Sequence, residues 1–179
     1  SSNRISNYMN SIFKYICVPT FIALHASSIY ANEDIPTDNF LNKIISNTRA
    51  DVSKGDLKTY NHPDRNLFIQ WIDNSPIRDA DVYAKNITII SDFVGNQWTD
   101  KGVISDNTTN INASGDINIT TYNDCVFTEG KGTTNISGFK NLNITSRSGF
   151  GLVDNGNGIT IEGGYQSVVS IKSEYRTRS

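Results

Sequence analysis

One phrase occurs twice in this chain, and its spacing constrains the fold more than any other feature. The first copy, TTNINASGDINIT, runs from Thr108 to Thr120, and the second, TTNISGFKNLNIT, runs from Thr133 to Thr145, 25 residues downstream without a gap. A fixed period of this kind describes a whole architecture, because each repeat is one structural unit that stacks on the next. The same frame aligns two sets of apolar residues: Ile111, Ile136 and Ile161, and Ile119, Ile144 and Val169.

Within each copy the apolar residues alternate with Asn, Thr and Ser, which is the period of a β-strand. Upstream, Ile87 lies 24 residues before Ile111, so we expect the repeats to run from about Asp81 to about Lys172. Frequent glycines and the absence of helix-forming runs exclude the helical repeat architectures. A unit this short cannot bury its own apolar face and must stack on its neighbours. The sequence therefore predicts an all-β protein, a parallel β-helix with both sets of apolar residues pointing inward.

The recurrent Asn, Thr and Ser residues have two explanations. AT-rich coding sequence inflates Asn and Ile, but identical polar residues one coil apart also form side-chain hydrogen-bond ladders. Because the alternation stays in frame with the 25-residue period, we favour the ladders. We attribute the Asn-x-Ser/Thr sequons at the following residues to the same pattern: Asn86, Asn107, Asn118, Asn135 and Asn143.

The N-terminal region has the layout of a secretory signal peptide. From Met9, which we take as the start, one lysine precedes an apolar run from Tyr15 to about Ala26, and small residues follow. Cleavage is expected between Ala31 and Asn32, or between Ser28 and Ile29. The run is too short to span a membrane, and we expect a helix with few contacts to the repeats. The alternative, a buried core helix, is disfavoured by Pro19 within the run.

Three regions follow from this reading. Residues 1–31 are the expected signal peptide with an upstream extension, residues 32–80 a cap, and residues 81–179 the repeats. In the cap, the sequence predicts a short helix at Phe40–Ile45 and a strand at Leu67–Ile72, with Phe68 and Trp71 in the core. Such a region would cover the strand edges of the first coil. The repeats end without a closing cap, so we expect the sequence to be the N-terminal part of a longer chain.

Composition excludes several classes of function. Once the signal peptide is removed, Cys125 is the only cysteine, which argues against a disulfide-stapled module; we expect this residue to be small, buried and unreactive. A net charge of −2 with scattered Lys and Arg gives no reason to expect nucleic acid as a partner. His62 then remains as the single histidine, so we predict no zinc site, no His-dependent triad and no cofactor.

Four short phrases carry a resemblance to a known group: KNITI (85–89), DINIT (116–120), KNLNIT (140–145) and GNGITIEGG (156–164). Together with the export signal, the cap and the near absence of cysteine, they resemble the passenger region of bacterial autotransporters and related surface adhesins. The resemblance implies a right-handed parallel β-helix that crosses the periplasm and is delivered to the bacterial cell surface by a C-terminal translocator β-barrel in the outer membrane. It also implies adhesion to glycans or proteins on host or bacterial cells.

A secreted polysaccharide lyase or hydrolase of the pectin-lyase type is the alternative function. Hydrolysis needs two acids that flank the sugar bond, whereas a lyase needs a base and usually a divalent cation. Most of the available aspartates adjoin Gly or Asn at expected turns, where Asp is favoured because its side chain bonds nearby backbone; they are Asp92, Asp100, Asp106, Asp116, Asp124 and Asp154. We therefore assign no catalytic residue. Two or more acids with Arg or Lys on one solvent face would favour the enzyme.

Aromatic residues near expected turns are the candidate ligand contacts of an adhesin. A ring exposed at a turn can stack on a sugar or anchor a protein partner. The candidates are Trp98, Tyr122, Phe150 and Tyr165. Alternatively, Trp98 and Phe150 fold back and plug the ends or corners of the coil.

Overall fold

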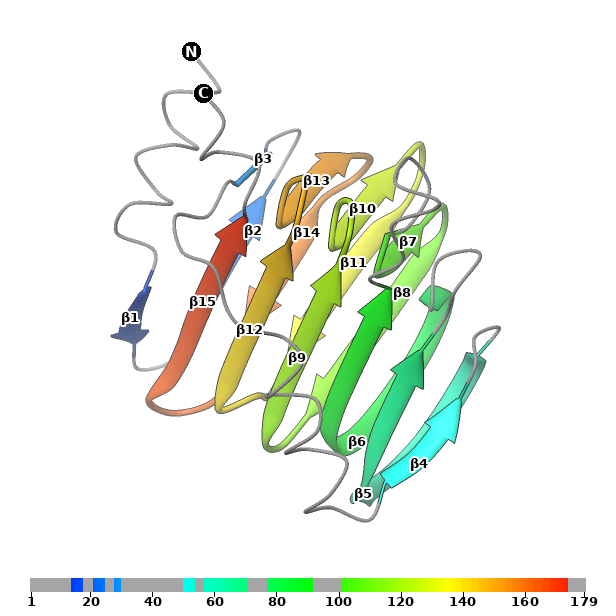
Figure 1. The fold of residues 1–179 in the computed structure, drawn as a ribbon, viewed down its shortest axis with the longest axis vertical. Coiled ribbons are helices and arrows are strands. Elements are labelled where there is room, and N and C mark those ends of the chain that lie inside the picture. Colours follow the sequence, from blue (N-terminus) through cyan, green and yellow to red (C-terminus); the bar gives the residue numbers. More distant parts are fainter. Residues whose placement is uncertain are drawn as a thin grey trace.

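The computed structural model describes residues 57–70, 77–91 and 101–173. It also gives the backbone of four short strands: Lys14–Cys17 (β1), Phe21–Leu24 (β2), Ser28–Ile29 (β3) and Ala50–Ser53 (β4). These described residues form strands and turns and include no helix, and therefore no helix long and apolar enough to cross a membrane. From β4 to Ser173, neighbouring strands pair in parallel and come from successive coils of the chain, so the protein is a parallel β-solenoid, as the repeat predicted (Figure 1).

Each coil contributes strand segments to three faces. The first two described coils are each a single long strand, Leu57–Gln70 (β5) and Ile77–Ser91 (β6). The later coils divide into shorter strands: Val103–Ser105 (β7), Thr108–Ala113 (β8) and Asp116–Thr121 (β9); Val126–Glu129 (β10), Thr133–Ser137 (β11) and Asn141–Ser146 (β12); and Leu152–Asn155 (β13), Ile159–Glu162 (β14) and Ser167–Ser173 (β15). The three ladders that start at β6 are β7–β10–β13, β8–β11–β14 and β9–β12–β15 (Figure 1).

Columns of isoleucine fill the core, as predicted for most of these positions. Ile136 pairs with Ile111 on one side and with Ile161 on the other, and all three side chains are fully buried. Ile144 likewise pairs with Ile119. Burying an isoleucine side chain stabilises a fold by about 1.5–3 kcal/mol, so each column contributes substantially to holding successive coils together.

At Val169 the predicted register was wrong by two residues. Val169 pairs with Leu142, while Ile144 pairs with Ile171. The turn at residues 163–166, before β15, lengthens this part of the coil, so that Leu142 and Val169 lie 27 residues apart (169 − 142) rather than 25. Because side chains alternate with a period of two, a shift by two residues keeps Val169 pointing into the core, where it is fully buried.

The predicted alignment of Ile87 with Ile111 was also wrong, again because the coils differ in length. Ile87 pairs with Ile117, and the partner of Ile111 is Val82. The connection from β6 to β7 runs from Ser91 to Val103, whereas β9 and β10 are joined by residues 122–125 alone. Coil length therefore varies at the corners, and the frame of one pair of coils does not extend to every other pair.

Polar side chains form the expected ladders on the outer surface. Asn135 Nδ2 donates to Asn110 Oδ1 at 3.0 Å, and Asn110 Nδ2 donates to Asp81 Oδ1 at 2.8 Å. On another face, Asn143 Nδ2 donates to Asn118 Oδ1 at 2.9 Å. Asn86 Nδ2 likewise donates to Asn66 Oδ1 at 2.8 Å, so four of the named sequon asparagines, Asn86, Asn118, Asn135 and Asn143, lie in ladders between coils, which confirms a structural role for the recurrent asparagines.

Hydroxyl groups form a second polar cluster inside the coil. Ser105 Oγ lies 2.8 Å from Thr109 Oγ1 and 2.6 Å from Thr134 Oγ1, and Thr128 Oγ1 lies 2.6 Å from Thr134 Oγ1. All four side chains are fully buried. Buried polar groups are costly unless they are hydrogen-bonded, and here each hydroxyl has a partner in its own or the next coil.

The N-terminal segment is not the helix that the sequence predicted. β1, β2 and β3 are strands, and they pair antiparallel with β15, β14 and β13, respectively. This pairing supplies hydrogen bonds to a strand edge that would otherwise be open, and β-branched and aromatic residues such as Ile16, Phe21 and Ile22 suit strands. The expectation of few contacts with the solenoid is therefore also wrong for these strands. The junction of Ala31 and Asn32 lies outside the described residues.

Parallel pairing also continues upstream of residue 81. β5 pairs with β6 and β4 pairs with β5, both in parallel. The strand predicted at Leu67–Ile72 is confirmed as far as Gln70, and the expected boundary between cap and repeats falls inside β6. Phe68 is buried, as predicted. Trp71 and the helix expected at Phe40–Ile45 lie outside the described residues.

Candidate functional site

Charged side chains gather at both ends of the face formed by β7 and β10. Within these strands, alternate residues point into the core, and the next ones point outward; the outward Phe127 of β10 is half-buried and pairs with Ile104 of β7. Lys101, Asp106 and Asp124 lie just outside these strands, Glu129 is the last residue of β10, and Arg78 belongs to the neighbouring strand β6. We call this set the β7–β10 face: Arg78, Lys101, Asp106, Asp124, Phe127 and Glu129.

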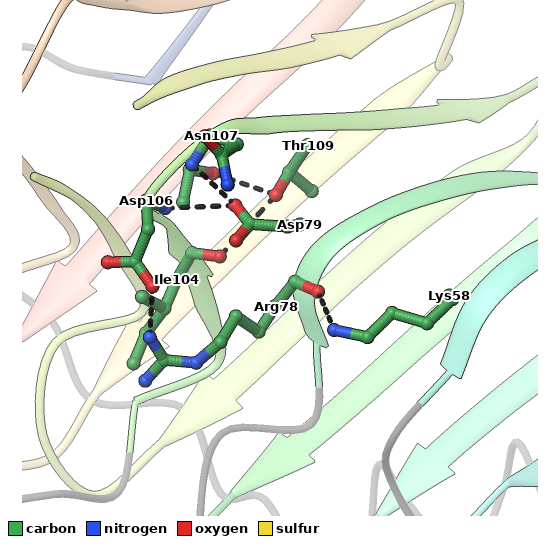
Figure 2. A network of polar contacts seen from close by, with 8 residues as sticks. Lys58, Arg78, Asp79, Ile104, Asp106, Asn107 and Thr109 are labelled. Carbon is green, nitrogen blue, oxygen red and sulfur yellow. Dashed lines mark hydrogen bonds and ion pairs between the residues drawn. The ribbon is translucent and has the colours of Figure 1, made fainter. Parts of the chain in front are cut away.

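Arg78 and Asp79 of β6 fix the turn that follows β7 (Figure 2). Asp79 Oδ1 accepts hydrogen bonds from the backbone N–H groups of Asp106 at 2.9 Å and Asn107 at 2.8 Å. Asp79 itself has a φ of 50°, a conformation that Asp tolerates better than most residues. The Arg78 guanidinium donates to the Asp106 carboxylate and forms an ion pair with it, and Lys58 Nζ donates to the Arg78 carbonyl at 2.7 Å. Groups of the two preceding coils thus hold Asp106 in place.

Asp106 and Glu129 form a pair of carboxyl groups on successive coils. The hydrogen bond from Glu129 lowers the pKa of Asp106, and Arg78 lowers it further, whereas burial acts in the opposite direction. The same hydrogen bond, together with burial and the charge of Asp106, raises the pKa of Glu129. Two neighbouring carboxyl groups cannot both ionise easily, so Asp106 loses its proton at lower pH than Glu129 does.

At the other end of the face, Lys101 lies between a carboxylate and an aromatic ring. Lys101 Nζ is 3.7 Å from Asp124 Oδ2 and 4.7 Å from the centre of the Phe127 ring, which is a cation–π geometry. Asp124 is buried, and burial raises its pKa despite the backbone N–H of Phe150, which donates to Asp124 Oδ1 at 2.8 Å, and the charge of Lys101. Asp124 therefore has contacts from the preceding and the following coil.

Two further candidate aspartates, Asp116 and Asp154, act in a ladder and in a turn. Asp154 is fully buried, and its Oδ1 accepts hydrogen bonds from the backbone of Gly156 at 3.0 Å and Gly158 at 3.2 Å. Asp116 Oδ1 accepts a hydrogen bond from Asn141 Nδ2 at 2.8 Å. The turn role predicted for aspartate is confirmed at Asp154. Asp92 and Asp100 lie outside the described residues.

The structure does not bring the candidate aromatic contacts together. Tyr122 and Phe150 are half-buried, and both lie in the connection from the β9–β12 face to the β10–β13 face, one coil apart. Tyr165 lies at a different corner, between β14 and β15, and is 75% exposed. Trp98 lies outside the described residues. Tyr165 is thus the described candidate best placed to contact a partner.

Cys125 is buried, as predicted. Burial raises the pKa of its thiol to about 12, and Sγ donates to the Thr145 carbonyl at 3.1 Å. His62 is exposed and makes an edge-on ring contact with Tyr60, with 4.9 Å between ring centres. Across the described residues, no three His, Cys, Asp or Glu side chains converge in a way that could hold a metal ion.

Sequence reasoning missed Arg78, Lys101 and Glu129. A signal for Glu129 was present: Val-Ile-Ser-Asp at 103–106 and Val-Phe-Thr-Glu at 126–129 share one pattern, in which an acid follows a buried hydroxyl residue. Aligning these tetrapeptides places the two acids side by side. Their spacing is 23 residues (126 − 103), which does not match the 25-residue frame.

Comparison with known proteins gives no match: no protein-family model matches the chain, and neither the curated proteins nor the solved structures include a significant relative.

Proposed function

We propose that this chain is part of a secreted, surface-displayed passenger of the autotransporter type and that it acts as an adhesin. Its partners would be glycans or proteins on host or bacterial cells. Export through the periplasm would begin with a signal peptide cleaved after Ala31 or after Ser28, and display would use a translocator β-barrel of the outer membrane. The parallel solenoid and the low cysteine content are compatible with this proposal.

The regular outer ladders are the observation that carries the proposal. In the column of Asp81, Asn110 and Asn135, amide groups repeat from coil to coil on a core of fully buried isoleucines. Each amide has two N–H donors and two acceptor positions, and the ladder bonds use one of each at Asn110. Such a surface offers hydrogen-bonding groups at the strand spacing of about 4.8 Å, which suits an extended glycan or peptide.

Tyr165 adds an aromatic contact at the edge of this surface. Its ring is 75% exposed in the turn between β14 and β15, where Gln166 has a φ of 55°. An exposed tyrosine combines an apolar ring with a hydroxyl group and is favoured at binding surfaces. Tyr83, which is 41% exposed on β6, lies two residues from Asp81 on the ladder surface itself and pairs with Asn112.

Display of the full-length protein on a non-adherent bacterium tests the adhesin proposal. Attachment to host cells, or aggregation of the bacteria, should rise above that of cells displaying no passenger. Tyr165→Ala should weaken attachment, whereas Lys131→Ala, which truncates an exposed side chain in the turn between β10 and β11, should leave it unchanged at equal surface expression. Equal attachment with and without the displayed passenger would refute the proposal.

A second candidate, polysaccharide cleavage, is favoured by one specific observation. Asp106 and Glu129 lie on successive coils with Arg78 beside them, which is the arrangement that the sequence analysis named as favouring an enzyme. The opposite pKa shifts that the two carboxyl groups cause in each other indicate that they lie close together, which argues against hydrolysis. Glycosidases hold their acids about 5–9.5 Å apart, which leaves room for the sugar bond or for water.

Turnover on a panel of uronate polymers, with and without Ca²⁺, separates the two candidates. We expect no product from the wild-type chain. Product formation that is lost in Asp106→Asn or Glu129→Gln would replace the adhesin proposal by the enzyme. Glu162→Gln, which changes an exposed acid on β14, is the control for nonspecific loss of charge.

A further inference from the structure

The outer edge of the β13–β14–β15 coil is occupied by the chain's own N-terminal segment. β1 pairs with β15 from Lys14↔Ser170 to Cys17↔Ser167. β2 then pairs with β14, and β3 pairs with β13. The segment therefore passes the three strands of one coil in reverse order, and each contact is antiparallel, whereas the stack itself is parallel (Figure 1).

This arrangement has a physical cause in the solenoid. Strands at the end of a stack present a row of unpaired N–H and C=O groups, which readily accept a strand from another chain. A further parallel coil would need the same groups that β1, β2 and β3 occupy. The antiparallel segment also cannot continue the parallel stack, so it blocks the edge without extending it.

We infer that β1, β2 and β3 form an intramolecular cap that keeps the β13–β14–β15 edge from pairing with a second copy of the chain. This role stands independently of adhesion. It is linked to the proposed export route in one respect, because cleavage after Ala31 would remove the cap and leave the edge able to accept another strand.

The pairing register supplies a test that uses a native cysteine. Cys17 and Ser167 are Cα partners in an antiparallel ladder, and directly opposite residues place their Cβ atoms on the same side of the sheet. In full-length Ser167→Cys, mild oxidation should therefore form an intrachain disulfide between residues 17 and 167. Cys125 is fully buried and should not compete.

Ser170→Cys is the matched control, because its Cα partner is Lys14 and not Cys17. We expect at least about tenfold more intrachain disulfide in Ser167→Cys, since a disulfide requires Cα atoms within about 7 Å. Moving the native cysteine, as in Lys14→Cys with Cys17→Ser, should restore the crosslink to Ser170→Cys. Folded Ser167→Cys that forms no intrachain disulfide would overturn the inference.

A second measurement tests the blocking role itself. Ile16→Pro and Ile22→Pro together should release β1 and β2, because proline cannot donate to a ladder. Light scattering should then show dimers of the full-length chain, and a peptide of residues 14–29 added in trans should return them to monomers. We expect the wild type to be monomeric. If the double variant is also monomeric and does not bind the peptide, the edge needs no cap.

Discussion

The carboxyl groups of Asp106 and Glu129, which lie on successive coils of one face, share a hydrogen bond while Arg78 pairs with Asp106. The two acids affect stability in opposite directions as pH changes. The lowered pKa of Asp106 contributes stability above its ordinary value of 3.8 that is lost as pH falls through the lowered value. The raised pKa of Glu129 contributes stability below its ordinary value of 4.5 that is lost as pH rises through the raised value.

Glu129→Gln should remove the loss of stability that accompanies the ionisation of Glu129 as pH rises. The glutamine amide donates permanently to Asp106, whereas the glutamic acid of the wild type loses its proton as pH rises and then places two negative charges together. The variant should gain stability over the wild type between about pH 5 and about pH 8, by about 0.5 kcal/mol, the scale of exposed charge pairs. Urea unfolding at both pH values measures this, with Glu162→Gln as control. An identical gain in both variants would contradict the coupling between Glu129 and Asp106.

Ile136 should tolerate small changes in size but not a charge. Ile136→Val should cost about 0.5–1.5 kcal/mol of unfolding free energy. Ile136→Asp should prevent folding, because it places an unpaired charge between Ile111 and Ile161. Circular dichroism and urea unfolding report both effects. Thr160→Asp, a half-buried outward position in the neighbouring coil, is the control and should still fold; an unfolded control would indicate general intolerance of charge.

Removing one amide from an outer ladder should have a moderate effect. Asn143→Ala takes away the donor to Asn118 Oδ1, whose residue is 6% exposed. We expect a loss of about 1 kcal/mol, the usual cost of one hydrogen bond. Asn157→Ala, which removes a longer bond of 3.3 Å at an exposed turn, should cost less. Equal stability of all three proteins would mean that the ladders do not contribute to stability.

The thiol of Cys125 should be unreactive until the chain unfolds. Burial raises its pKa from 9.0 to about 12, and this contributes stability below pH 9 that is lost as pH rises toward 12. In a Cys17→Ser background, a thiol reagent at pH 8 should label Cys125 only in denaturant. Rapid labelling of the folded protein would contradict its burial.

Processing of the exported protein tests the signal peptide. Mass spectrometry should find an N-terminus at Asn32 or at Ile29. Recovery of Met9 in the surface-exposed protein would count against cleavage and leave the N-terminal cap in place on the cell surface.

How much of the structure the sequence could predict depends on where the residues lie along the coil. The inward columns followed from alternation and period, because strand side chains repeat strictly every two residues. The pairing partners of Val169 and Ile87 could not be predicted in this way. Coil length is set by turns such as residues 163–166, and the packing of strands does not limit the length of those turns.

Sequence reasoning predicted the wrong structure for the N-terminal segment and did not predict the acidic pair. An apolar run such as Tyr15–Ala26 is compatible with a helix or with strands, and the choice depends on the partner available, here the edge of β13, β14 and β15. Asp106 and Glu129 come together at a 23-residue interval, two residues short of the repeat, so a search at the repeat period passes over them.

The two-residue lengthening of the turn before β15 has a consequence for how such a chain can be altered. Gly163, Gly164, Tyr165 and Gln166 add length outside the core, while Val169 and Ile171 still occupy the inner columns. A graft of foreign peptide between Gly164 and Gln166 would be displayed outward at a fixed corner, with the hydrophobic columns on either side unchanged, which makes this loop the natural position for an inserted epitope tag.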